Sequence, residues 1–135
     1  MENDFFLFSP APSMSPLNVR ADSLTEHSIR VRFDPIPPSH HNGPLQGYNV
    51  YYRNKDHHHD HEGTKITIGA SERQVIIDGL ETMKNYEISM TAFNDKEGPR
   101  SEEIEVVPGK DYFQAVSRLN ILFAQNACLI LRTCD

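Results

Sequence analysis

Tryptophan is absent from this chain of 135 residues, and cysteine is nearly so. Both cysteines, Cys128 and Cys134, lie close to the C-terminus, so the chain before them must fold without a disulfide. The longest apolar stretch, residues 119–131, has about 13 residues and includes Asn and Gln, whereas a membrane-spanning helix requires roughly 20. We therefore expect a domain held together by its core, with no membrane insertion by this chain.

A surplus of basic residues is also missing. Lys and Arg number 13 against 19 for Asp and Glu, which gives a formal net charge of −6. Nucleic-acid binding needs clustered cations to neutralise phosphates, and anionic lipid surfaces attract the same clusters. The N-terminus, MENDFFLF, carries acidic residues where a secretory leader would be basic. We expect neither nucleic acid nor a membrane surface as a partner, and we recognise no signal peptide.

Motifs for catalysis are lacking as well. The sequence has no glycine-rich phosphate loop, no GxSxG turn and no HExxH helix, and no Asn-x-Ser/Thr glycosylation site. Its carboxylates fall in turns or at outward positions of expected strands, whereas a catalytic acid needs a cleft that shifts its pKa. We expect no catalytic residue and no cofactor, so the chain is not expected to be an enzyme.

The strongest pattern that is present lies in the segment LETMKNYEISMTAFN, residues 80–94. From Tyr86 onward it alternates with period two, which is typical of a strand with one face in a core and one in water. The inward set is Tyr86, Ile88, Met90 and Ala92, and the set expected in water is Glu87, Ser89 and Thr91.

Six further segments have strand character and are separated by turn residues. They are residues 17–21, 28–34, 47–54, 64–68, 73–77 and a last strand around Ile104 and Val106. This pattern predicts an all-β fold, a seven-stranded antiparallel β-sandwich of immunoglobulin-like type. The side chains expected to meet in its core are Phe33, Tyr48, Val50, Tyr52, Val75, Leu80, Tyr86 and Ile88.

The landmarks resemble those of a fibronectin type III domain. Leu80, a short polar turn and Tyr86 resemble the tyrosine corner of β-sandwiches, in which the phenol hydroxyl bonds back to the backbone. The proline-rich entry SPAPSMSP, the strand GYNVYY and the turn Gly98-Pro99 follow the family in order. Phe33 stands where the family usually has Trp, and Thr82 and Lys84 depart from its corner turn. Met90 and the two tyrosines at 48 and 52 are expected to fill the space that Phe33 leaves.

The resemblance divides the chain into residues 1–9, an unstructured lead-in, residues 10–108, the domain, and residues 109–135, a tail foreign to the family. In the tail, Tyr112, Phe113, Val116, Leu119, Leu122 and Phe123 line one face of a short amphipathic helix. Three readings of the tail are open: a product of truncation, splicing or gene-model read-through, a helix that docks on a partner, or a strand added to the sandwich.

The run HHHDH, residues 57–61, is the one candidate for metal binding. In an extended loop His57, His59 and His61 would point the same way, and imidazole suits zinc, nickel or copper. The competing reading is a solvated loop between two strands, because metal sites usually gather ligands from separate rigid elements. No metal site is therefore predicted, although these histidines are weak candidates.

A candidate protein-binding surface is expected on the outward side of two neighbouring strands, at Tyr51, Arg53 and Glu87. Tyr and Arg are enriched at protein contacts, although the same residues can simply stabilise a sheet through cross-strand pairing. The loop NDKEGPR, residues 94–100, lacks the Arg-Gly-Asp integrin motif that some family members carry there.

By resemblance, the chain is a non-catalytic interaction or spacer module of a cell-surface adhesion molecule or receptor, extracellular, usually in tandem with similar domains, with a protein partner. The alternatives are an intracellular structural module and a metal-binding module through residues 57–61.

Overall fold

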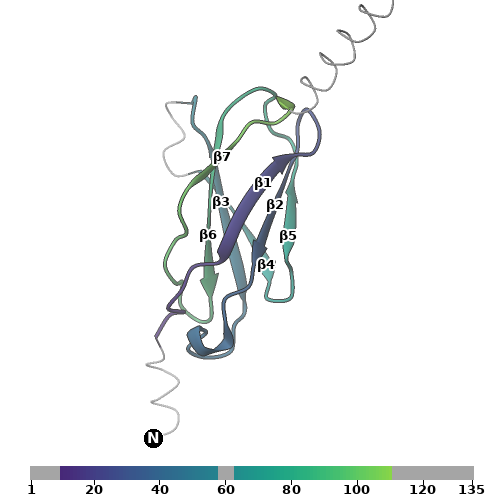
Figure 1. Ribbon diagram of the computed structural model, residues 1–135. Helices are drawn as coiled ribbons and strands as arrows, with labels where there is room; N and C mark the ends of the chain where they lie inside the picture. The colour runs from purple at the N-terminus through teal and green to yellow at the C-terminus, as the bar shows by residue number, and fades with distance from the viewer. Residues whose placement is uncertain (1–9, 58–62, 111–135) are drawn as a thin grey trace, which may run out of the picture.

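Two antiparallel sheets face each other in the computed structural model, which describes residues 10–57 and 63–110 (Figure 1). The described residues form seven strands and one short 3-10 helix, and this architecture confirms the predicted sandwich. The elements are β1 Leu17–Ser23, β2 Ile29–Asp34, η1 Pro38–His40, β3 Gly47–Asn54, β4 Thr64–Gly69, β5 Gln74–Ile77, β6 Tyr86–Phe93 and β7 Ile104–Val106.

The first sheet has the order β1-β2-β5 and the second the order β4-β3-β6-β7. The longest unbroken register joins β3 to β6, from Gly47 opposite Phe93 to Asn54 opposite Tyr86. β1 carries an irregularity between Leu17 and Arg20, where Asn18 adopts a left-handed backbone. Among the described residues no helix is long and apolar enough to cross a membrane.

The core lies between the sheets and is filled by the inward residues of each strand. The ring centroids of Phe33 and Tyr48 are 4.7 Å apart at a tilt of 58°, so an aromatic pair occupies the space where the family usually has Trp. Of the predicted core, Tyr52 and Val75 are only partly buried, and Ile36 joins the core without having been singled out. The buried members of the predicted set are Phe33, Tyr48, Val50, Leu80, Tyr86 and Ile88.

The outward residues of β6 contradict the prediction that they lie in water. Glu87, Ser89 and Thr91 are exposed by only 8%, 3% and 2%, respectively. They are covered because β6 lies between β3 and β7, and because side chains of the following loop fold over the sheet, including Glu97, which accepts a hydrogen bond from Thr91. Alternation separated the two faces of the strand correctly, but it could not show what lies above the outer one.

The turn before β6 has the expected corner geometry. The Tyr86 hydroxyl accepts a hydrogen bond of 2.8 Å from the backbone N–H of Glu81, while Leu80 donates its own N–H to the carbonyl of His27 at 2.9 Å. Met83 in the same turn has φ of 60°, and its N–H is held by the carbonyl of Pro108 at 2.9 Å. These bonds tie the turn to the β1–β2 loop and to the end of the domain.

The substitution Phe33→Ala tests the aromatic pair. We expect it to lower the free energy of unfolding by about 3–5 kcal/mol, because it removes a buried ring and leaves a cavity. Chemical denaturation measures this, with Leu24→Ala as control. Leu24 is 44% exposed and its truncation should change stability by less than about 0.5 kcal/mol. Equal effects of the two substitutions would contradict the assigned core.

Tyr86→Phe tests the corner hydrogen bond. Removing the hydroxyl should cost about 0.5–1.5 kcal/mol of unfolding free energy, because the Glu81 N–H loses its acceptor. Tyr48→Phe is the matched control, since the Tyr48 hydroxyl is buried and has no hydrogen-bond partner among the described residues. Its removal should be neutral or stabilising. The corner bond is irrelevant to stability if the two variants unfold alike.

Candidate protein-binding face

The outer face is defined here as the side of the β4-β3-β6-β7 sheet that points away from the core. Its centre is built by β3 and β6, which set their outward residues directly opposite one another. The cross-strand pairs are Asn49 with Thr91, Tyr51 with Ser89, and Arg53 with Glu87. The three residues predicted to form a binding surface, Tyr51, Arg53 and Glu87, therefore do lie together on this face.

One end of the outer face is an ion-pair cluster. The Arg53 guanidinium donates to the Glu87 carboxylate from Nε at 2.7 Å and also through a terminal nitrogen. Lys55 lies 3.5 Å from the other oxygen of Glu87 and 2.6 Å from Glu105. The hydrogen bond from Arg53 is the main reason that the pKa of the Glu87 carboxyl lies below its ordinary value. Glu87 is thus ionised, and each of its carboxylate oxygens has a basic partner.

The other end is organised by Glu97, from the loop between β6 and β7. One oxygen of its carboxylate accepts hydrogen bonds from Asn49 Nδ2 at 3.2 Å, from Thr91 Oγ1 at 2.6 Å and from the Tyr51 hydroxyl. Thr67 of β4 in turn donates to Asn49 at 2.7 Å. The network therefore links β4, β3, β6 and the loop through one carboxylate.

The same network shifts two pKa values. Burial works to raise the pKa of Glu97, but the three donors from Thr91, Tyr51 and Asn49 together outweigh it, so this pKa lies below the ordinary value of 4.5. Burial raises the pKa of the Tyr51 phenol, and its hydrogen bond to Glu97 raises it further. At neutral pH the carboxylate is charged and the phenol keeps its proton, which is the state that this hydrogen bond needs.

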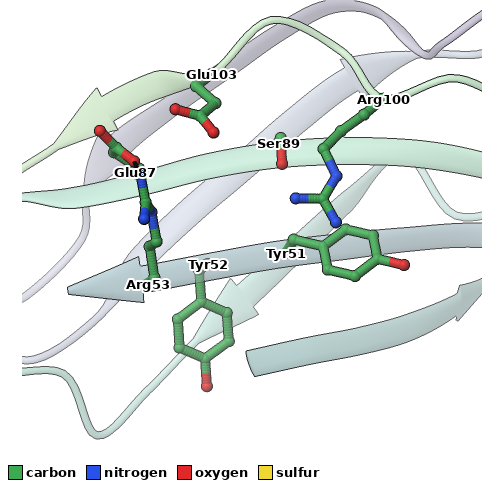
Figure 2. Close-up of a pocket in the computed structure, with 7 residues that line it drawn as sticks. All are labelled: Tyr51, Tyr52, Arg53, Glu87, Ser89, Arg100 and Glu103. Atoms are coloured by element: carbon green, nitrogen blue, oxygen red, sulfur yellow. Dashed lines mark hydrogen bonds and ion pairs between the residues drawn. The ribbon is translucent and has the colours of Figure 1, made fainter. Parts of the chain in front are cut away.

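Arg100 lies over the ring of Tyr51, with its guanidinium carbon 4.0 Å from the ring centroid (Figure 2). The backbone beside it is fixed from two sides, because Ser101 N–H donates to the carbonyl of Met90 at 2.8 Å and the Ser101 hydroxyl accepts from Met90 N–H at 2.9 Å. The loop and the sheet thus fix the Arg100 guanidinium and the Tyr51 ring relative to each other.

A small hollow lies between the two ends of the face. It is lined by Tyr51, Tyr52, Arg53, Glu87, Ser89, Arg100 and Glu103 (Figure 2). Its volume of ≈ 20 Å³ is room for about one water molecule. Sites for small-molecule ligands are commonly ≈ 300–1,000 Å³, so this face suits contact with another macromolecule rather than enclosure of a substrate.

Sequence reasoning missed Glu97 and Arg100, which complete the face. Both belong to NDKEGPR, the loop that lacks an Arg-Gly-Asp motif. The available signal was the turn Gly98-Pro99, which returns the chain toward the sheet. No alternation extends across such a turn, so the sequence alone could not show that these two side chains lie over Tyr51.

The histidine run is only partly described. His57 Nε2 lies 3.7 Å from a carboxylate oxygen of Glu81, whereas His59 and His61 are outside the described residues. Within 10–57 and 63–110, no group of three or more His, Cys, Asp or Glu side chains is arranged to hold a metal ion. The lead-in at 1–9 and the predicted tail helix also lie outside the described residues.

Residues 11–107 match the fibronectin type III domain, and the chain belongs to this family. It is 35% identical over 122 residues to mouse protein sidekick-1, an alignment that covers 86% of this chain and 6% of sidekick-1. It is 32% identical over 102 residues to zebrafish neural cell adhesion molecule L1.1, covering 68% of this chain and 8% of that relative. The resemblance drawn from the sequence is thereby confirmed.

A solved structure supports the same assignment. The third fibronectin III domain of the human KIAA0343 protein superposes with a TM-score of 0.67 at 28% identity, covering 74% of this chain and 86% of that domain. The curated relatives named above are far longer, since this chain spans less than a tenth of each.

The Glu97 network predicts a pH dependence. Because the folded-state pKa of Glu97 is lowered, its contribution to stability is present above pH 4.5, the ordinary pKa, and is lost as the pH falls through the folded-state value. Glu97→Gln should therefore unfold with a shallower loss of stability below pH 4.5 than the wild type, as measured by urea denaturation at several pH values.

The control for this experiment is Glu102→Gln. The carboxylate of Glu102 is exposed and accepts no hydrogen bond among the described residues, so this variant should keep the wild-type slope. A wild-type slope in Glu97→Gln would show that the three donors do not stabilise the ionised carboxylate.

Proposed function

We propose that this chain is a non-catalytic protein-recognition module of a cell-surface adhesion molecule or receptor, and that it binds a protein partner through the outer face. The observation that carries the proposal is the preassembled group of Tyr51, Arg100 and Glu97 on the outer face. The relatives support the context, because one of them is named a neural cell adhesion molecule.

The chemistry of the face favours recognition over catalysis. Tyr and Arg are the residues that most often dominate binding energy at protein interfaces. Here the ring, the cation and the carboxylate are already fixed, so less conformational freedom is lost on binding. Glu87 and Glu97 both have lowered pKa values, which makes them poor general acids. The hollow that Glu87 lines, at ≈ 20 Å³, is too small to enclose a substrate.

A spacer role is a second candidate, favoured by one observation. The described chain begins at Pro10 and ends at Lys110 at opposite ends of the sandwich (Figure 1). Such a domain would extend a series of similar domains in a line. We place the module outside the cell or at its surface, in series with other domains, in accord with the adhesion relatives. The two roles are compatible, and only recognition requires the outer face.

The recognition role predicts that binding depends on one sheet and not on the other. Beads coated with the full chain should adhere to cultured neurons, and Arg53→Ala combined with Tyr51→Ala should reduce adhesion at least about tenfold, the effect of losing interface anchors. The matched control is Arg30→Ala on the outward side of β2, which should adhere as the wild type does. Adhesion that survives the outer-face double substitution, or is lost equally in the control, would contradict the proposal.

A further inference from the structure

Two opposite charges on the outer face lack an ion-pair partner. Among the described residues Arg100 forms no ion pair with any carboxylate, and Glu103 forms none with any cation. Of the other charges on this face, Arg53 pairs with Glu87 and Lys55 with Glu105, whereas Lys65 acts on Glu97 through its charge without a direct ion pair. Arg100 and Glu103 are both exposed and only three positions apart in the chain.

The surroundings of Arg100 suit an incoming carboxylate. Its guanidinium is held over Tyr51, and the buried Ser89 beside it has a hydroxyl with no hydrogen-bond partner in the described part of the chain. Figure 2 shows Arg100 reaching toward Ser89. Guanidinium and hydroxyl can both donate, and an ionised carboxylate accepts several such bonds at once.

The surroundings of Glu103 suit an incoming cation. Glu103 lies on the other side of Ser89 (Figure 2) and lines the same hollow as Glu87. Glu87 already has two basic partners in Arg53 and Lys55, whereas Glu103 has none. A cation placed beside Glu103 would supply the ion pair that this carboxylate lacks among the described residues.

We infer that the outer face binds a second copy of this chain, related by a two-fold axis that passes between Arg100 and Glu103. A two-fold interface brings residue i against residue j and, at the same time, j against i. Arg100 of each copy then meets Glu103 of the other, and both unpaired charges are neutralised in one contact. The second copy supplies an acid and a base at the required spacing. The inference deepens the proposed recognition role and rests on it.

The contact is expected to be weak, because exposed ion pairs add little affinity and the hollow between them is small. Multiple copies at a cell surface would strengthen it through avidity. The full chain should therefore be examined by sedimentation equilibrium at concentrations up to about 1 mM, where contacts with a Kd near that value are populated. We expect a monomer–dimer equilibrium that shifts toward monomer as salt is raised.

Charge reversal tests the geometry. Arg100→Glu places like charges against Glu103 of the other copy, and Glu103→Arg does the same against Arg100, so each variant alone should be monomeric. An equimolar mixture of the two variants should dimerise, because opposite charges then meet at both contacts. Arg30→Glu on the other sheet is the matched control and should dimerise as the wild type does. Circular dichroism checks that all variants are folded.

A wild-type chain that stays monomeric throughout this range overturns the inference, as do variants that still dimerise alone or a mixture that does not restore dimers. These outcomes leave the proposed function intact if the bead assay still depends on Tyr51 and Arg53, since the partner is then another protein. If the mixture of the two charge-reversal variants dimerises but bead adhesion does not depend on Tyr51 and Arg53, the adhesion role is contradicted and the self-association is supported.

Discussion

The pairing of β3 with β6 is the interaction on which the rest of the structure depends. Its unbroken register places Tyr48, Val50 and Met90 into the core on one side and Asn49, Tyr51 and Thr91 onto the outer face on the other. A shift of one residue would exchange the two sets, exposing the core and burying the polar network without partners. The same hydrogen bonds between strands therefore specify the interior and the candidate binding face together.

Both sides of β6 are buried in this pair, but they are held by different chemistry. The inner side is apolar and stabilised by packing, so it tolerates changes that keep volume. The outer side is polar, and its buried groups must keep their hydrogen bonds. A single carboxylate oxygen of Glu97 accepts hydrogen bonds from three side chains of this face, Asn49, Tyr51 and Thr91. The loop from β6 to β7 is consequently as much a part of the fold as the strands are, even though it has no regular structure.

The sequence predicted the strands well because each carries its own local signal, alternation bounded by Gly, Pro or Asp. It predicted the neighbourhood of Tyr51, Arg53 and Glu87 because adjacent strands in a sandwich of this kind follow from the family resemblance. It did not predict the burial of Ser89 and Thr91, since alternation carries no information about what covers a face. The positions of Glu97 and Arg100 depend on the path of the loop across the sheet, which only tertiary contacts determine.

The contrast between the two sheets bears on where a partner binds. On the β1-β2-β5 sheet the outward arginines of β2 share Asp22, which lies 2.8 Å from Arg30 and 3.5 Å from Arg32, so their charges are largely satisfied within the sheet. On the outer face Arg100 forms no ion pair among the described residues. It is held instead over the aromatic ring of Tyr51, which carries no counter-charge. A cation fixed in place without an anion gains most from a partner that brings one, because its own ordering is already complete. That asymmetry, more than the composition of either sheet, is the reason for proposing recognition at the β3–β6 side of the domain.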